Sequence, residues 1–360
     1  MAMQPDFERL RTALFCGQPD RVPTAELKCE DFIKGAFLGE KMPAATSDPR
    51  GYIAKDVEFH YRAGYDYMRV APTVDYGDHW RAARHSYAAG SAEASTRKWA
   101  LSHEGLINTE DDFSRFPWPA ASSATYEWLD IADELLPPEM QLATSLKGGG
   151  IFERAWMLMG FEQFSFALLE RPDFAARMVD ATGEVYFRFL QTALQHPRVQ
   201  LLWLGDDLAY ATGLMVSPDF LRERVFPWYR RIAELCHSFD PPKAFVFHSD
   251  GHLWEVLDDL IELGIDALHP IEPKAMDIVQ VKRHCAGRVC IIGNIDLGYT
   301  LTRGTPEEVR QEVRERIATC GPGGGYVVSS SNSVTEYVPI DNYRAMLAAV
   351  EEFGTYPLDV

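Results

Sequence analysis

Short continuous apolar runs recur along this chain, and each is followed by a polar or glycine-rich cluster and then by a segment of helical periodicity. Unbroken apolar runs of this length are typical of strands buried on both faces of a parallel sheet. The runs fall at residues 22–29, 65–72, 140–150, 199–207, 244–250, 265–273, 289–296 and 326–332. We therefore expect about eight parallel strands that alternate with helices.

The segments between the runs predict helices, most clearly over residues 172–194, 218–239 and 305–320. The last of these opens with Thr305, Pro306 and two glutamates, the residue types that favour a helix N-terminus. Gly321 and Pro322 then predict its end. Helices of this kind would cover the outer face of the sheet.

This alternation, without a visible domain boundary, predicts a closed (β/α)8 TIM barrel in one domain spanning residues 1–360. The alternative is a doubly wound sheet, but no GxGxxG motif follows the first strand. Residues 1–20 predict an N-terminal helix. Residues 75–138, rich in Ser, Ala, Pro and Trp, predict a large loop insertion.

Composition narrows the class of protein. The 360 residues are 46% hydrophobic and carry a formal charge of -18, which disfavours nucleic acid or an anionic membrane as a partner. No stretch has the pattern of a signal peptide or a membrane span. Six scattered cysteines are typical of reduced thiols. We expect a cytoplasmic protein.

Polar clusters stand at the ends of the apolar runs, where the active sites of (β/α)8 barrels lie. These clusters are Asp206 and Asp207, His248 and Asp250, His269 and Glu272, Asn294 and Asp296, and Ser329 to Asn332. They predict one shared, acidic barrel mouth.

Each cluster has alternative interpretations. Asp206 and Asp207 are adjacent, so at most one points into the mouth. His248 and Asp250 share a face and suit a metal site or an acid/base pair, although Asp250 also suits a turn into Gly251. His269 precedes Pro270, and a structural role fits it as well as a functional one. Asp296 stands where a helix cap is expected.

Longer motifs resemble the uroporphyrinogen decarboxylase superfamily of (β/α)8 barrels, which also holds cobalamin-linked methyltransferases. The resemblance rests on PDRVP, GLINTEDDFSRFPWP, RPDFAARMVDA, GDDLAYATGLMVSPDFLRERVFPWY, FHSDGHL, GIDALHPIEP, IIGNIDLGYTLTRGTPEEVRQEVRERI and GGGYVVSSSNSVTEYVPIDNYRAM. It implies a homodimer, a small-molecule substrate and, for the methyltransferase branch, a corrinoid protein as methyl acceptor.

Departures from the superfamily patterns shape the predicted site. The arginine-rich segment of the decarboxylases reads AELKCEDFIKG here, and their C-terminal histidine falls on Asn332. The methyltransferases hold zinc with a His-x-Cys pair and a distant cysteine. This chain keeps His248 but has Asp250 and Asn332 at the two cysteine positions. Such nitrogen and oxygen donors suit Zn²⁺ or another divalent ion without a thiolate.

We therefore predict methyl transfer or demethylation of a small substrate, with His248, Asp207 and Asp250 as catalytic residues. The candidate metal ligands are His248, Asp250, Asp207 and Glu153. The candidate substrate-binding residues are Asn332, Arg154, Lys147, Tyr210 and Asn294. The alternatives are decarboxylation, for which Lys28, Lys34, Lys147 and Arg154 offer the cations, and a non-catalytic binding barrel with a closed mouth.

Overall fold

A computed structural model describes residues 4–77, 80–84, 96–100, 105–285 and 287–360, and its centre is one parallel sheet. Seven strands follow in the order β1-β4-β5-β8-β9-β10-β11, and every pairing between neighbours is parallel. They are β1 Tyr67–Val70, β4 Gln141–Thr144, β5 Val199–Gly205, β8 Ala244–His248, β9 Ala267–His269, β10 Cys290–Ile292 and β11 Tyr326–Val327. Each lies within a predicted apolar run.

The first predicted strand, residues 22–29, extends this sheet only through isolated bridges. Thr24 pairs in parallel with Val328, just beyond β11, and Cys29 pairs with Val334. Across the segment, the Tyr67 hydroxyl on β1 donates a 2.7 Å hydrogen bond to the Glu26 carbonyl. The segment therefore lies between the two end strands of the curled sheet.

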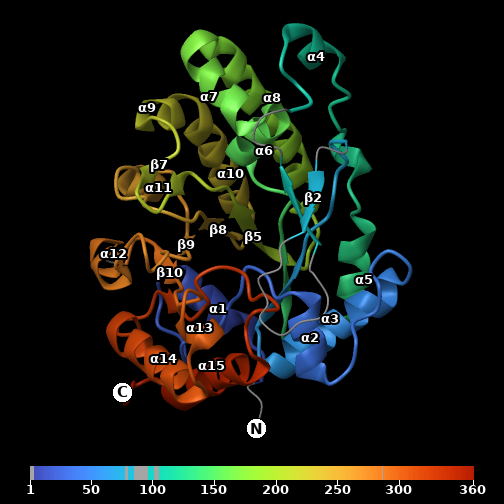
Figure 1. Cartoon of the computed structure of the whole chain (residues 1–360). Helices are drawn as coiled ribbons and strands as arrows, with labels where there is room; N and C mark the ends of the chain where they lie inside the picture. Colours follow the sequence, from blue (N-terminus) through green and yellow to red (C-terminus); the bar gives the residue numbers. More distant parts are fainter. Residues whose placement is uncertain (1–3, 78–79, 85–95, 101–104, 286) are drawn as a thin grey trace.

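Helices surround the strands, which occupy the middle of the molecule (Figure 1). The α-helices are α1 Phe7–Leu14, α2 Asp31–Leu38, α3 Pro49–Ala63, α4 Glu110–Arg115, α5 Glu127–Leu135, α6 Ile151–Met159, α7 Phe161–Glu170, α8 Pro172–Ala193, α9 Pro218–Phe220, α10 Phe226–His237, α11 Leu257–Glu262, α12 Ile278–Cys285, α13 Thr300–Arg303, α14 Pro306–Cys320 and α15 Ile340–Phe353. A short 3-10 helix, η1 (Ala121–Ser123), precedes α5, and a short π-helix, η2 (Leu221–Val225), joins α9 to α10. In the part of the chain that is described, no helix is both long and apolar enough to cross a membrane.

The predicted helix ends agree with local chemistry. Thr305 caps α14, where its hydroxyl accepts from the Glu308 amide and the Glu308 carboxylate accepts in return from the Thr305 amide. The helix ends at Gly321. Helix α1 lies in the region 1–20 that was predicted to be helical.

The region 75–138 differs in part from the predicted loop insertion. A hairpin of β2 (Trp80–Arg84) and β3 (Thr96–Ala100) lies within it, and residues 78–79, 85–95 and 101–104 fall outside the described residues. Its end forms α5, which contacts β1 and β4 as a covering helix. The apolar positions Leu129 and Ala132 are buried, so helical periodicity outweighs the Ser- and Pro-rich composition upstream.

Large side chains fill the interior of the sheet below the mouth. Trp203 on β5 is fully buried, and it stacks on Tyr67 at 6.0 Å between ring centroids. The Trp203 ring also contacts the His269 ring on β9 edge-on, at 5.3 Å between ring centroids. These rigid aromatic contacts fix the strand ends on which the polar clusters lie.

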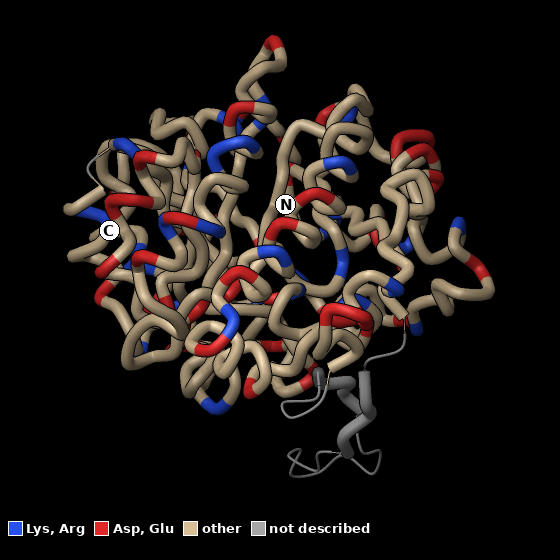
Figure 2. The backbone as a smooth tube through the Cα atoms, turned by 90° about the horizontal axis from the view of Figure 1, so that it is seen from above, with Lys and Arg blue, Asp and Glu red and all other residues tan. Residues whose placement is uncertain are grey.

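Charged residues of both signs are interspersed along the described chain (Figure 2). The formal charge of -18 is therefore spread over the molecule rather than gathered in one segment. No single segment of the described chain therefore accounts for the negative charge.

Candidate metal centre

The polar clusters after β5 and β8 lie side by side because these strands pair in parallel, with Gly205 opposite His248. Asp207 follows β5 by two residues and Asp250 follows β8 by two residues. The chain turns at Gly251, which has a φ of 90°. A Cβ there would lie 2.4 Å from the Ala209 carbonyl oxygen, so glycine is required for this close approach.

The adjacent Asp206 and Asp207 point to different surroundings. The Asp206 carboxylate is fully buried, and it accepts hydrogen bonds of 2.7, 2.8 and 2.7 Å from the first three amides of α6, those of Ile151, Phe152 and Glu153. The Tyr229 hydroxyl donates to it at 2.7 Å. A carboxylate at a helix N-terminus is a stabilising arrangement, so Asp206 is structural.

Asp207, His248 and Asp250 come together at the mouth. The His248 Nε2 atom lies 3.7 Å from Asp207 Oδ1 and 3.9 Å from Asp250 Oδ1. One ligand atom from each residue lies within 4.8 Å of the others, and among the described residues this is the group of three with such spacing. The Asp250 amide also donates to Asp207 Oδ1 at 2.9 Å. The backbone thus fixes one carboxylate against the next.

One carboxylate oxygen of Asp250 lacks a hydrogen-bond donor or a cation. Its Oδ2 atom accepts a 2.6 Å hydrogen bond from Asn332 Nδ2, whereas its Oδ1 atom is buried without a hydrogen-bond partner. Burial, together with the negative charges of Asp207 and Glu272, raises the pKa of Asp250 to about 8, although the Asn332 bond opposes this. A divalent cation at Oδ1 would satisfy this oxygen and offset the repulsion, so the residues fit such an ion.

The histidine of the group is suited to act as a neutral ligand. Burial lowers the pKa of His248, and the positive charge of Arg69 adds to this effect while Asp207 opposes it. An imidazole that is neutral near pH 7 keeps one ring nitrogen available for a metal. The geometry assigns that role to Nε2, the atom that faces the two carboxylates.

A buried hydrogen-bonded chain supports His248 from behind. Its Nδ1 atom lies 2.7 Å from His269 Nδ1, and His269 Nε2 lies 3.1 Å from the Ser329 hydroxyl. Ser329 donates to the Glu26 carboxylate at 3.3 Å, and the Ser330 hydroxyl donates to the same oxygen at 2.5 Å. Donation along the chain toward Glu26 leaves the His248 Nε2 lone pair directed at the mouth. His269 therefore has a positioning role that the sequence left open.

A cavity of about 800 Å³ opens beside this group, and His248, Glu153 and Lys147 line it. Burial and the charges of Asp207 and Asp206 raise the pKa of the Glu153 carboxyl well above its usual range. Glu153 was predicted as a fourth metal ligand, but it is not part of the three-residue group. Its position suits a proton-holding residue of the cavity wall instead. The open cavity also differs from the closed mouth expected of a non-catalytic barrel.

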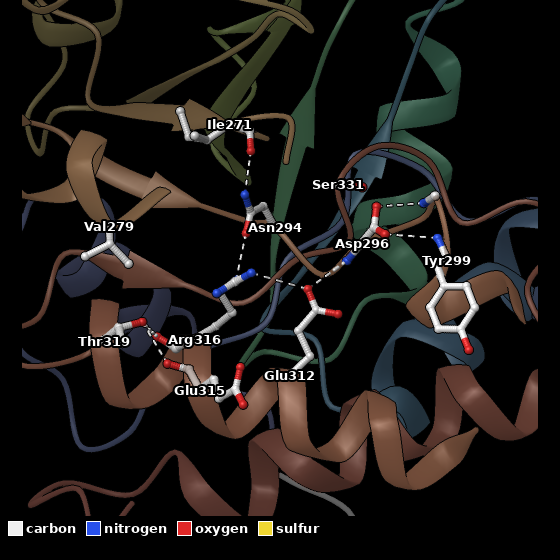
Figure 3. A network of polar contacts seen from close by, with 12 residues as sticks. Ile271, Val279, Asn294, Asp296, Tyr299, Glu312, Glu315, Arg316, Thr319 and Ser331 are labelled. Carbon is white, nitrogen blue, oxygen red and sulfur yellow. Dashed lines mark hydrogen bonds and ion pairs between the residues drawn. The ribbon is translucent and has the colours of Figure 1, made fainter. Parts of the chain in front are cut away.

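Asn294, a predicted substrate-binding residue, lies outside the cavity lining and is fully engaged by the protein (Figure 3). Its Nδ2 atom donates to the Ile271 carbonyl at 2.5 Å, and its Oδ1 atom accepts from Arg316 at 3.1 Å. In the same network, Asp296 accepts from the amides of Gly298 and Tyr299 in the turn before α13, whose N-cap residue is Tyr299 and not Asp296. The side-chain amide of Asn294 therefore holds loops together, and its role in substrate binding stays a prediction.

Arg154 and Tyr210, also predicted to bind substrate, do not line the cavity either. Arg154 is buried, donates to the Gly148 carbonyl and lies over the Tyr76 ring at 4.6 Å. Tyr210 is exposed on a short hairpin of β6 (Ala209–Tyr210) and β7 (Gly213–Leu214). Their roles in substrate binding stay predictions, and in this structure Arg154 contacts the protein interior while Tyr210 lies at the surface.

Two residues of the site were not predicted. Arg69 lies on β1 and lines the cavity, and Glu26 ends the buried chain behind His248. The signal for both was a charged residue within an apolar run, YDYMRVAP for the arginine and VPTAELKC for the glutamate. Charged residues are rarely buried without a specific role.

Parts of this chain are similar in sequence to known proteins. Methylcobamide:CoM methyltransferase MtaA of Methanosarcina barkeri is 20% identical over 230 residues, 64% of this chain and 63% of that protein. The uroporphyrinogen decarboxylase of Methylobacillus flagellatus is 32% identical over 112 residues, 31% of this chain and 30% of that protein. The chain thus spans less than two thirds of the length of either curated relative.

The fold is shared over nearly the whole chain. A methyltransferase from Methanosarcina mazei superposes with a TM-score of 0.70 at 18% identity, over 96% of this chain and 98% of that one. The family model for uroporphyrinogen decarboxylase (URO-D) matches residues 103–353. Because that match covers well over half of the sequence, the chain belongs to the uroporphyrinogen decarboxylase family.

Proposed function

We propose that this protein is an enzyme that transfers a methyl group from a small substrate, with a corrinoid protein as acceptor, and that Asp207, His248 and Asp250 hold a divalent metal, zinc by preference. The methyltransferase names of one relative and of the M. mazei structure favour this reaction class.

One observation carries the metal assignment: Asp250 Oδ1 is buried without a partner, 3.9 Å from His248 Nε2 and beside a second carboxylate. A buried carboxylate oxygen without a donor costs free energy, which a bound cation would offset. When bound, the metal would act as a Lewis acid on an oxygen or nitrogen of the substrate.

The chain's own residues have separable tasks in this proposal. His269 and its hydrogen-bonded chain hold the His248 ring, and Asn332 holds Asp250 through the 2.6 Å bond to Oδ2. Burial and the charges of Asp207 and Asp206 raise the pKa of the Glu153 carboxyl well above its usual range, which favours its protonated form. It would give this proton to the oxygen or nitrogen from which the methyl group departs.

Decarboxylation of a carboxylic acid is the second candidate, and the cationic lining of the cavity favours it. Arg69, Lys28 and Lys147 all line the cavity, and cations of this kind bind carboxylates. Turnover of uroporphyrinogen by the purified protein would favour this reaction over methyl transfer.

We also propose that the sheet closes into an eight-stranded barrel within one domain of residues 1–360. The bridge from Thr24 to Val328 and the bond from Tyr67 to Glu26 support closure through the segment 22–29. A homodimer, which the family resemblance implies, is testable by light scattering of the full chain.

The decisive experiment is metal analysis of protein purified without a histidine tag, alongside a His248→Ala variant. We expect near one divalent ion per wild-type chain and a marked loss in the variant. His284→Ala is the matched control, because His284 is a partly exposed histidine that pairs with Asp258 away from the mouth. Wild-type protein without near-stoichiometric metal, after supply of Zn²⁺, would contradict the proposal.

A further inference from the structure

Glu26 is almost fully buried, and both polar groups of its backbone are fixed. The Tyr67 hydroxyl donates to the Glu26 carbonyl at 2.7 Å, and the Glu26 amide donates to the same hydroxyl at 3.1 Å. The segment around Glu26 also pairs in parallel with the chain just beyond β11, through the bridge of Thr24 with Val328. A carboxyl group at this depth needs specific partners, because burial without them is costly.

Three donors from the chain after β11 converge on the Glu26 carboxyl group. Its Oε1 atom accepts from the Ser330 amide at 2.9 Å, and its Oε2 atom accepts from the Ser329 hydroxyl at 3.3 Å. The Ser330 hydroxyl lies 2.5 Å from the same Oε2 atom. A carboxyl group can accept at both oxygens, whereas a side-chain amide can accept at one only. The two donors at separate oxygens therefore require a carboxyl side chain.

The first serine leads to His248 through what we call the histidine arm, Ser329 and His269. The Ser329 hydroxyl lies 3.1 Å from His269 Nε2, and His269 Nδ1 lies 2.7 Å from His248 Nδ1. Because the Ser329 proton is directed at Glu26, the Ser329 oxygen accepts from His269 Nε2–H. His269 Nδ1 then accepts from His248 Nδ1–H, which leaves the His248 Nε2 lone pair on the side of the two carboxylates. The acceptor at Glu26 thus sets the tautomer of His248.

The second serine leads to Asp250 through the asparagine arm, Ser330 and Asn332. The Ser330 hydroxyl lies 2.8 Å from the Asn332 carbonyl oxygen. The Asn332 side chain is oriented in turn, because its Oδ1 atom accepts from the Ser333 amide at 2.6 Å and its Nδ2 atom donates to Asp250 Oδ2 at 2.6 Å. Glu26 therefore holds the segment whose side-chain amide orients the second ligand.

We propose that Glu26 is the common positioning residue of the metal centre, and that it orients His248 through the histidine arm and Asp250 through the asparagine arm. This rests on the proposed function, because it assigns a task toward the same metal. Glu26 does not belong to the cavity lining, so it acts on a bound metal through the two arms. A change at Glu26 should disturb both ligands, whereas the loss of one serine hydroxyl should disturb one.

The first measurement uses the full chain without metal. Imidazole ¹⁵N NMR, assigned with the His248→Ala variant, reports which nitrogen of His248 carries the proton. We expect the Nδ1–H form in the wild type. Glu26→Met removes both acceptor oxygens and frees the Ser329 hydroxyl to donate to the histidine arm, so we expect a mixture of both tautomers. Ser329→Ala should show a similar mixture, and Ser330→Ala should keep the wild-type form.

The second measurement is the affinity for Zn²⁺, by competition with a chromophoric chelator. We expect a loss of about 10- to 100-fold in Glu26→Met, the usual range for the outer partners of metal ligands. Glu26→Gln keeps one acceptor oxygen and should lie between Glu26→Met and the wild type. Ser329→Ala should weaken binding in the wild-type background but add little in Glu26→Met, because both changes release the same arm.

Asp66→Leu is the matched control, because it also removes a buried carboxyl group, but next to the start of β1. There the Asp66 carboxylate accepts from the Asp6 amide at 2.8 Å and from Arg9 at 3.1 Å. We expect this variant to have a lower free energy of unfolding, measured with urea, and the wild-type tautomer and Zn²⁺ affinity. An equal loss of affinity in Asp66→Leu would assign the effect to general destabilisation and overturn the proposal.

The wild-type tautomer together with wild-type affinity in Glu26→Met would also overturn it. If Glu26→Met does not fold, the serine variants decide, since each removes a single hydroxyl group. An unchanged tautomer in Ser329→Ala, with unchanged affinity in both Ser329→Ala and Ser330→Ala, would then contradict the assignment. The expected change of tautomer in a chain that takes up no Zn²⁺ would support the positioning role and contradict only the metal centre.

Discussion

The Nδ1 atoms of His248 and His269 lie 2.7 Å apart at the ends of the paired strands β8 and β9. At this distance one ring nitrogen donates and the other accepts, so the two imidazoles cannot both carry a proton there. Burial, with His248 as the next cause, holds the pKa of His269 well below its usual range. The pair is therefore a neutral unit that fixes which nitrogen of His248 faces the cavity.

Removing the support should weaken metal binding without removing a ligand. For His269→Gln we expect the affinity for Zn²⁺ to fall by about 10- to 100-fold, the usual effect of losing the partner of a metal-ligating histidine. Competition with a chromophoric chelator at neutral pH measures this change. His284→Gln, away from the mouth, should bind as the wild type does; equal affinities in both variants would mean that His269 does not position His248.

Glu26, at the far end of the same chain, predicts a pH dependence of stability. Burial raises its pKa from 4.5 to about 8, although Ser330 and Ser329 donate to it. Between these values the folded protein binds more protons than the unfolded chain, so the free energy of unfolding falls as the pH rises. Glu26 alone should contribute up to about 1.4 kcal/mol per pH unit to the slope that urea unfolding of the wild type shows.

Glu26→Gln should reduce that slope by the contribution of Glu26 between pH 5 and pH 8, because the glutamine does not titrate, whereas Asp250, whose pKa is also raised to about 8, keeps its own contribution. Glu139→Gln is the matched control, since Glu139 is an exposed glutamate and the same charge is removed. A slope that persists in Glu26→Gln at its wild-type size would assign it to other groups.

The strands and their order could be predicted from the sequence, because parallel strands are buried on both faces and give unbroken apolar runs. All seven strands of the sheet fall within predicted runs. The helical end of the region 75–138 was missed, because α5 is short and follows a Ser- and Pro-rich stretch. Composition of that stretch obscured the burial of Leu129 and Ala132.

For the site, the sequence predicted only that polar residues at the strand ends would lie close together. Adjacency of Asp206 and Asp207 correctly requires different surroundings, but only the structure identifies α6 as the partner of Asp206. Nothing in the sequence indicated that Arg316, 22 residues away, donates a hydrogen bond to the amide oxygen of Asn294. Contacts over such separations leave no local pattern in the chain, and the same holds for the grouping of Arg69 with Lys28 and Lys147.

A buried ion pair beside the cavity predicts a strong stability effect. Lys34 Nζ lies 2.8 Å from Asp56 Oδ1, and both side chains are almost fully buried. Although burial alone would raise it, the charges of Lys34 and His60 hold the pKa of Asp56 below its usual range. Lys34→Met would leave this carboxylate without its main partner, and we expect the free energy of unfolding to fall by about 3–5 kcal/mol.

The double variant Lys34→Met with Asp56→Leu should recover much of that loss, because neither charge then remains buried. Lys55→Met serves as control: Lys55 pairs with Glu40 and Glu58 at the surface, and its loss should be small. Urea unfolding at pH 7 measures all three. A double variant no more stable than Lys34→Met alone would refute the ion-pair explanation.

Variants of the two adjacent aspartates after β5 should separate an effect on stability from an effect on metal binding. Asp206→Asn keeps the shape but puts an amide where three backbone amides and the Tyr229 hydroxyl now donate to a carboxylate. Hydrogen bonds to a charged group are worth about 1.5–3 kcal/mol each. We expect a loss of unfolding free energy of about 3 kcal/mol or more in this variant.

For Asp207→Asn we expect the opposite result, namely a loss of metal affinity with little change in stability. The Asp207 carboxylate accepts from the Asp250 amide, and an asparagine carbonyl can still do so, which leaves the fold near wild-type stability. The site loses one negative charge next to His248 Nε2, and the affinity for a divalent cation should drop. Urea unfolding and metal titration of both variants measure the two effects. Loss of metal affinity in Asp206→Asn at wild-type stability, or a lower free energy of unfolding in Asp207→Asn with wild-type metal affinity, would exchange the roles assigned to the pair.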